Sequence, residues 1–216
     1  MTRIKICGLT RPEDVRLSVE AGAHAVGFVH VPHSKRYVDR ARLQELCRAA
    51  GPMVTRVAVI ADLPLEEALS LAQETPLMVL QLHGQEDLAY VQALRSRLDP
   101  RVGLWRAVRG DSPQARADAL AMVGLVEALL LDSDGGSGTP FDWKSAEGFE
   151  PGCPVLLAGG LTPENVGPAI QRLQPFAVDV SSGVEGAPGR KDPARLHAFF
   201  TAVRTVSRFA ASEGRV

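Results

Sequence analysis

Eight short apolar or β-rich runs recur at a nearly constant interval along the 216 residues, and this regularity limits the folds that the chain can adopt. The runs are RIKICG from Arg3, AVGFV from Ala25, TRVAVI from Thr55, MVLQLH from Met78, VGLWRAV from Val102, ALLLD from Ala128, PVLLAGG from Pro154 and AVDVSSG from Ala177. Helical patterns separate them, among them PEDVRLSVEAG, LEEALSLAQE, EDLAYVQALRSRL and PENVGPAIQRL. Strands that alternate with helices predict parallel βαβ units.

Eight such units in one chain of this length predict an α/β fold, a closed (β/α)8 or TIM barrel, because barrels of this class start at about 200 residues. The runs are apolar almost throughout, as expected of strands that are buried on both faces. An open, eight-stranded parallel sheet is the alternative. No Pro/Ser-rich linker divides the sequence, so we expect a single catalytic domain over residues 1–216, with a frayed tail from about 207 to 216.

Three of the helical patterns begin with a start signal. The segment Thr10–Glu13 has the spacing of a capping box. Thr162-Pro163 and Asp192-Pro193 each combine a capping residue with a proline suited to the first helical turn. We therefore expect helices to start directly at these three places.

Composition excludes several classes of protein. The net charge is −1, so no basic surplus points to nucleic-acid binding. No apolar run approaches the ~18 residues that a membrane span needs, and the amino-terminal residues do not resemble a signal peptide. The three cysteines are widely spaced and odd in number, which argues against a disulfide framework and a zinc site and favours the cytoplasm.

The active site of a (β/α)8 barrel is built where the strands end and the following loops begin. Polar or small residues gather at these positions, whereas the strand starts are mostly apolar or basic. The strand ends carry Cys7-Gly8, His33–Arg36, Gln81–Gly84, Asp132, Ala158–Gly160 and Asp179–Gly183. The sequence therefore predicts a polar site at one end of the barrel.

Two of these strand ends predict a phosphate site. Gly159, Gly160, Ser181, Ser182 and Gly183 place small residues where backbone N–H groups can approach an anion, after the seventh and eighth strands. The alternative is that these glycines only make tight turns. No P-loop lysine is present, so a nucleoside triphosphate is not expected.

Asp132 and Cys7 are the candidates for acid–base chemistry. Asp132 closes the apolar run ALLLD, where partial desolvation can raise the pKa of a carboxyl group towards that of a general acid; a helix or turn cap is the alternative. Asp134 becomes the candidate acid if the sixth strand ends two residues later. The following GGSG is either a plain loop or a lid, and Asp142 is the more obvious cap.

Cys7 is either a base or one more buried, inert thiol, and no cation adjoins it within KICGLT. Cys47, in a helical pattern, and Cys153, before the seventh strand, are expected to be structural. Arg36 can grip a carboxylate with its planar fork, or it is an ordinary surface arginine. His83 binds either a ligand or a neighbouring backbone group.

Asp179 alternates with two valines and should turn into the barrel, where a carboxylate needs N–H or hydroxyl partners. The remaining histidines lack metal-ligand spacing, so no metal is expected.

The motifs KICGLT, GFV followed by SKRYV, QLHG, LLLD with GGSGTPFDW, LAGGLTPENV and DVSSGVEGAPGRKD together resemble the phosphoribosylanthranilate isomerase family of tryptophan biosynthesis, from Lys5 to about Asp192. This resemblance implies a (β/α)8 barrel without a cofactor that converts N-(5-phosphoribosyl)anthranilate into 1-(2-carboxyphenylamino)-1-deoxyribulose 5-phosphate by an Amadori rearrangement. It makes Cys7 the general base and Asp132 the general acid. It assigns Arg36 to the anthranilate carboxylate and the two glycine- and serine-rich loops to the phosphate.

Other functions compete with this one. A histidine-pathway isomerase on the same barrel typically carries aspartate in place of Cys7 and needs a second phosphate site. A ribulose-phosphate epimerase would bring metal-binding histidines to the strand ends. A barrel that binds a phosphorylated ligand without turnover is the alternative outside enzymes. The sequence does not distinguish a monomer from a homodimer.

Overall fold

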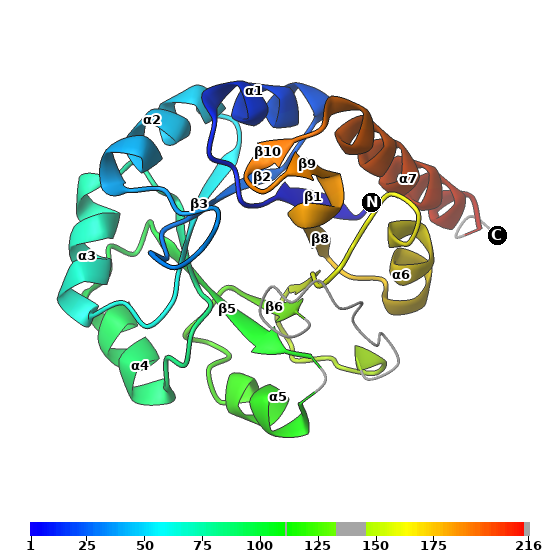
Figure 1. Ribbon diagram of the computed structural model, residues 1–216. Helices are drawn as coiled ribbons and strands as arrows, with labels where there is room; N and C mark the ends of the chain where they lie inside the picture. The colour runs from blue at the N-terminus through cyan, green and yellow to red at the C-terminus, as the bar shows by residue number, and fades with distance from the viewer. Residues whose placement is uncertain (111, 133–145, 214–216) are drawn as a thin grey trace.

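A closed barrel of eight parallel strands, in sequence order from β1 to β8, forms the centre of the molecule. The computed structural model describes residues 1–110, 112–132 and 146–213, with side chains described up to residue 206. Helices surround the barrel on the outside, as the view in Figure 1 shows. The predicted (β/α)8 fold is confirmed, and the open sheet is excluded because β8 pairs with β1.

Each of the eight predicted runs contains one barrel strand. The strands are β1 (Arg3–Ile6), β2 (Ala25–Val29), β3 (Thr55–Ile60), β4 (Val79–Leu82), β5 (Gly103–Arg109), β6 (Ala128–Asp132), β7 (Val155–Leu157) and β8 (Ala177–Val180). The helices are α1 (Pro12–Ala21), α2 (Arg40–Ala50), α3 (Leu65–Glu74), α4 (Leu88–Arg97), α5 (Pro113–Leu120), α6 (Val166–Leu173) and α7 (Pro193–Glu213).

A short 3-10 helix, η2 (Ser182–Val184), follows β8, and then comes an antiparallel hairpin of β9 (Glu185–Ala187) and β10 (Arg190–Lys191) that the sequence did not predict. The hairpin lies beside α1 and the end of β1 in Figure 1. Two hydrogen bonds fix it there. The Thr10 hydroxyl donates to the carbonyl of Gly189, 2.6 Å away, and the Lys191 N–H donates to the buried carboxylate of Asp14 on α1.

Successive side chains along each strand point alternately to the helices outside the barrel and to its interior. On β1, Ile4 and Ile6 face outward and join the apolar core beneath the helices, whereas Lys5 between them faces the interior. On β8, Val178 and Val180 likewise face outward and Asp179 faces inward, as predicted. A small cluster of apolar side chains elsewhere in the fold comprises Ala25, Val57, Val79 and Trp105.

The predicted helix start within Thr10–Glu13 is confirmed, because α1 begins at Pro12, but Thr10 is not its cap. The start at Thr162-Pro163 is wrong by three residues. α1 has Arg11 as its N-cap without a side-chain hydrogen bond, because the Thr10 hydroxyl is committed to the hairpin instead. α6 starts at Val166 rather than after Thr162, and the Asn165 side chain accepts the Thr162 N–H. The start at Asp192-Pro193 is confirmed, since the Asp192 carboxylate accepts the Arg195 N–H at 2.9 Å.

The structure places the remaining features as follows. Cys47 is buried on α2, and Cys153 precedes β7 and is partly buried. α7 continues to Glu213, and the frayed end expected from about residue 207 stays a prediction. In the part of the chain that the structure describes, no helix has both the length and the apolar character of a membrane span.

Candidate active site

Cys7 lies directly after β1, and Lys5 lies next to it inside the barrel. The Cys7 N–H donates to the carbonyl of Val180 at 2.8 Å, which extends the β1–β8 pairing by one residue. Lys5 is opposite Asp179 in that pairing, and its Nζ donates to Asp179 Oδ2 at 2.7 Å. Both Cys7 and Lys5 contact Gly27 on β2: a Cβ there would lie 2.8 Å from Cys7 Sγ and 3.1 Å from Lys5 Nζ. The expectation that no cation adjoins the thiol is therefore wrong.

Burial and charge act in opposite directions on this thiol. Burial raises the pKa of Cys7 above its usual value. Lys5 lowers this pKa, the Asp179 carboxylate raises it, and Lys191 lowers it, each to a smaller extent than burial. The pKa of Lys5 is raised, because Asp179 and the Cys7 thiolate outweigh its burial. Lys5 therefore stays protonated, and it and Lys191 supply the cations that a thiolate at this position requires.

Arg36, in the loop after β2, is held by Glu185 of β9. Arg36 Nε donates to Glu185 Oε1 at 2.8 Å, and Nη2 donates to Oε2 at 2.6 Å, in a two-point ion pair. The side chain passes over Gly8, whose φ is +71° and where a Cβ would lie 2.4 Å from Arg36 Cδ and 2.6 Å from Ser181 Oγ. Gly8 therefore allows Arg36 and Ser181 to approach the end of β1.

Lys191 of β10 completes this cluster. Its side chain is fully buried, and Nζ donates to the carbonyl oxygens of Cys7 at 2.6 Å and Ser181 at 3.0 Å and to Glu185 Oε1 at 2.9 Å. Hydrogen bonds from Arg36 and Lys191 bring the pKa of Glu185 below its usual value, although burial alone would raise it. Sequence analysis identified neither Glu185 nor Lys191, although both lie within the motif DVSSGVEGAPGRKD.

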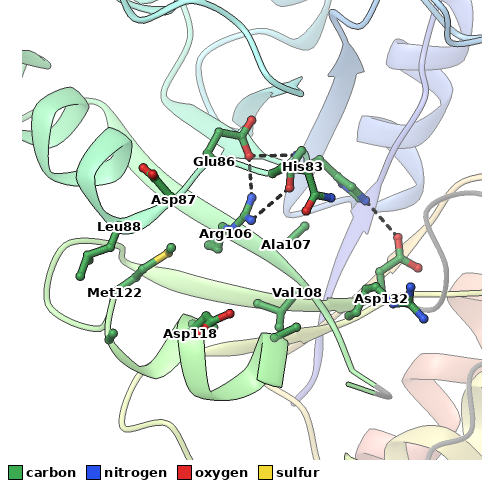
Figure 2. Close-up of a pocket in the computed structure, with 16 residues that line it drawn as sticks. His83, Glu86, Asp87, Leu88, Arg106, Ala107, Val108, Asp118, Met122 and Asp132 are labelled. Atoms are coloured by element: carbon green, nitrogen blue, oxygen red, sulfur yellow. Dashed lines mark hydrogen bonds and ion pairs between the residues drawn. The ribbon is translucent and has the colours of Figure 1, made fainter. Parts of the chain in front are cut away.

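Asp132 and His83 form a second group at the ends of β6 and β4. Figure 2 shows the two side chains pointing toward each other, with His83 Nε2 3.3 Å from Asp132 Oδ2. The other ring nitrogen, Nδ1, lies 3.1 Å from Nε2 of the buried Gln81. β6 is described as Ala128–Asp132, so the choice of Asp132 over Asp134 as the acid stays a prediction. Asp134, Asp142 and the GGSG segment lie outside the described residues.

A cavity of about 670 Å³ opens beside this second group, between the loop after β4, strand β5 and helix α5 (Figure 2). His83 and Asp132 line it, together with the ion pair of Arg106 and Glu86. Cys7, Arg36 and Ser181 do not line it. The cavity thus covers the side of the barrel mouth that holds His83 and Asp132, and the group around Cys7 and Arg36 lies outside it.

The two candidate phosphate loops pack tightly against each other. Gly159 and Gly160 both have positive φ, +82° and +66°, which glycine adopts without strain. A Cβ on Gly183 would lie 1.9 Å from the carbonyl oxygen of Leu161, so only glycine fits where the loop after β8 meets the loop after β7. The two loops therefore form one continuous surface at the mouth.

Three buried side-chain atoms have no hydrogen-bond partner within the described residues: Gln81 Oε1, Asp179 Oδ1 and Ser181 Oγ. All three belong to residues at the carboxyl ends of β4 and β8. Buried polar atoms are rarely left unpaired, and a ligand at this end of the barrel would supply the missing partners. Across the same described residues, no group of three or more His, Cys, Asp or Glu side chains could hold a metal ion.

Comparison with known proteins agrees with this geometry. Residues 4–202 match the family model of N-(5'phosphoribosyl)anthranilate (PRA) isomerase. The chain belongs to this family. The PRA isomerase of Thermosynechococcus vestitus is 41% identical over 203 residues, covering 92% of this chain and 88% of that protein.

Solved PRA isomerase structures share the fold over almost the whole chain. The Thermotoga maritima enzyme has a TM-score of 0.86 and 38% identity, over 95% of this chain and 100% of that one. A second PRA isomerase structure, in complex with reduced 1-(o-carboxyphenylamino)-1-deoxyribulose 5-phosphate, has a TM-score of 0.84 and 36% identity over the same shares. Membership of the PRA isomerase family thus rests on both sequence and fold.

Proposed function

We propose that this chain is the isomerase that converts N-(5-phosphoribosyl)anthranilate into 1-(2-carboxyphenylamino)-1-deoxy-D-ribulose 5-phosphate in tryptophan biosynthesis. One observation carries the proposal: a thiol, Cys7, follows β1 and a carboxyl group, Asp132, ends β6 of one closed barrel. Arg36 and the glycine-rich loops after β7 and β8 lie at the same end of that barrel. The reaction moves protons only, so it needs one acid, one base and firm attachment of both substrate ends.

In the first step, Asp132 acts as the general acid. It protonates the ring oxygen of the ribose, the C1′–O bond breaks, and the nitrogen lone pair forms the Schiff base. His83 faces the same carboxyl group at 3.3 Å and fixes its orientation towards the substrate.

In the second step, Cys7 acts as the general base. The thiolate removes the proton from C2′, the electrons of that C–H bond form the C1′–C2′ double bond, and the iminium nitrogen becomes an amine. The resulting enolamine tautomerises to the ketone. The ammonium group of Lys5 stabilises the thiolate form that this step requires.

Arg36 and the loops after β7 and β8 hold the two ends of the substrate. Arg36 binds the anthranilate carboxylate through Nη1, the nitrogen that its ion pair with Glu185 does not use. Gly159, Gly160, Ser181, Ser182 and Gly183 bind the phosphate, with the unpaired Ser181 Oγ as one donor. Asp179 Oδ1 and Gln81 Oε1, also unpaired, accept hydrogen bonds from ribose hydroxyls.

A steady-state assay on freshly generated phosphoribosylanthranilate, following the loss of its fluorescence, tests the proposal. Wild type should consume the substrate well above its spontaneous breakdown. Cys7→Ala and Asp132→Asn should each lower kcat by about 10²- to 10⁴-fold, the usual contribution of acid–base catalysis. Cys153→Ala, which removes a thiol at the other end of the barrel, is the matched control.

An inactive wild type that is still thermally stabilised by a substrate analogue would instead favour a non-catalytic binding barrel. If Asp132→Asn changes KM alone, the carboxylate is a binding group and not the acid.

We further infer a single-domain enzyme of the cytoplasm that needs no cofactor and binds no nucleic acid. The three free cysteines support that compartment. The related Thermotoga maritima isomerase is dimeric, and for this chain we infer a monomer or a homodimer.

A further inference from the structure

Glu185 poses an electrostatic problem for the carboxylate site. It holds the Arg36 fork at two points, 2.8 and 2.6 Å, and its own side chain is only 4% exposed. An isolated arginine–carboxylate pair of this kind is formally neutral, and a neutral pair attracts a ligand carboxylate only weakly. Arg36 therefore needs another cation nearby if it is to bind one.

Lys191 is that cation. Its Nζ has three acceptors, the carbonyl oxygens of Cys7 and Ser181 and Glu185 Oε1. A neutral amine has only two N–H donors, so satisfying all three acceptors requires the ammonium form. Glu185 Oε1 thus accepts from Arg36 Nε on one side and from Lys191 Nζ on the other.

Two further charges contact the backbone of the same hairpin. Arg195 Nη1 donates to the Glu185 carbonyl at 3.1 Å, and Asp14 Oδ2 accepts the Lys191 N–H at 3.1 Å. These two charges are opposite and offset each other. Lys5 and Asp179 also offset each other, and burial, the largest influence on Cys7, raises the pKa of that thiol and favours its neutral form. With the thiol neutral, Arg36, Lys191 and Glu185 leave one net positive charge in the cluster.

This net charge can meet a ligand only through Arg36. The Lys191 side chain is 0% exposed and all of its donors are engaged, whereas the Arg36 side chain is 22% exposed. We propose that Lys191 is a positioning residue of the isomerase site: by offsetting the charge of Glu185, it leaves Arg36 with a net positive charge for the carboxylate of the substrate. The inference rests on the proposed function, which assigns that carboxylate to Arg36.

The central test compares Lys191→Met with Lys191→Met/Glu185→Gln. Lys191→Met leaves Glu185 to neutralise Arg36, so KM should rise about tenfold to a hundredfold, the loss of one charge-assisted hydrogen bond. The double variant removes the carboxylate as well and returns the net charge to Arg36, so its KM should recover to within about fivefold of wild type. Lys35→Met, which removes an exposed lysine next to Arg36, is the control and should change KM by no more than about twofold.

A merely structural role for Lys191 gives a different pattern. The double variant would then be as poor as Lys191→Met or worse, and this result overturns the proposal. In an Arg36→Met background, Lys191→Met should raise KM no further, because its effect acts through the guanidinium. A further rise of about tenfold there would equally contradict it.

Folding is checked by circular dichroism and thermal melting of every variant. If Lys191→Met does not fold, Lys191→Gln replaces it, since the amide still donates to carbonyl oxygens but carries no charge. If neither folds, Glu185→Gln alone decides: it removes the negative charge that Lys191 offsets and leaves both cations, so KM should fall below that of wild type, and a rise above about tenfold overturns the proposal. If wild type shows no turnover, the proposed function and this inference are both overturned. If wild type is active but the double variant does not recover its KM, only this inference is overturned.

Discussion

Lys5 and Asp179 form a buried ion pair directly below the candidate base. The pair joins β1 to β8 in register, and both side chains are almost fully buried. Burying either charge alone would cost several kcal/mol, and the contact between the two side chains offsets that cost. Their effects on Cys7 differ in sign, since Lys5 lowers the pKa of the thiol and Asp179 raises it.

Replacing Lys5 by methionine should therefore raise the pKa of Cys7. The thiol would lose the nearest charge that opposes the effects of its burial and of the Asp179 carboxylate. The base would then be protonated up to a higher pH, and the acidic limb of kcat/KM would move upward by the same amount. The pKa is measured from the pH dependence of iodoacetamide alkylation in a Cys47→Ala/Cys153→Ala background, where Cys7 is the one remaining thiol.

Lys5→Met/Asp179→Asn is the matched control for this measurement. It removes both charges with little change in volume, so its thiol pKa should lie below that of Lys5→Met. An alkylation profile that is the same in wild type and Lys5→Met would show that Lys5 does not act on the thiol.

Most of the site residues that the sequence predicted stand at or just after the end of a strand, and Arg36 lies further along, in the loop after β2. Cys7, Asp132 and Asp179 could be found because a polar residue interrupts an apolar run there. Lys5, the register partner of Asp179, interrupts its strand in the same way. It was missed because only the immediate neighbours of Cys7 were considered, whereas its spacing of two from Cys7 places both side chains on one face of β1. Glu185 is 149 residues from Arg36, and no local pattern predicts a contact of that separation.

At the scale of elements, the strands were predictable, whereas the cap of α1 and the start of α6 were not. An apolar run between helices has few alternatives to a buried parallel strand. A threonine before a helix has several alternatives to capping it, because its hydroxyl can donate to any acceptor that the fold brings near. Thr10 donates to Gly189 in a hairpin 179 residues away, so a local capping rule could not predict its partner.

The contact between the loops after β7 and β8 predicts the effect of a single methyl group. Gly183→Ala would place Cβ 1.9 Å from the carbonyl oxygen of Leu161, a backbone atom that cannot move aside without shifting the loop. We expect a loss of about 1–3 kcal/mol in unfolding free energy and a marked weakening of inhibition by inorganic phosphate.

Gly186→Ala in β9 is the control for this prediction. Its nearest atom would be the Asp192 Cβ at 3.8 Å, an ordinary contact, so stability should change by less than about 0.5 kcal/mol. Denaturant unfolding and phosphate inhibition of both variants measure the effect. Equal behaviour of the two variants would show that the loops are free to separate.

At the scale of the whole molecule, the wall of the barrel and the helices form one core. Outward-facing residues of β1 and β8 pack in the same cluster as Leu43 and Cys47 of α2 and Phe199 of α7. Such a core is expected to unfold as a unit, so a local change in protonation is felt in the stability of the whole domain. Cys47 reports on this directly, because burial raises the pKa of its thiol from an ordinary value near 9 to about 12.

Because folding raises the pKa of the Cys47 thiol, the folded state becomes less stable as the pH rises. Between pH 9 and 12 the thiol ionises in the unfolded chain but stays neutral in the folded one, so stability is complete below pH 9 and is lost as the pH rises. Between pH 8 and pH 10.5, wild type should lose about 2 kcal/mol more unfolding free energy than Cys47→Ala does. Urea unfolding of both proteins at the two pH values, with a reductant present, measures this difference. The space left by the removed sulfur costs the variant some stability at both pH values, and the comparison cancels that cost. Equal losses in the two proteins would mean that the Cys47 thiol ionises in the folded state and that α2 is not packed against the barrel as the structure has it.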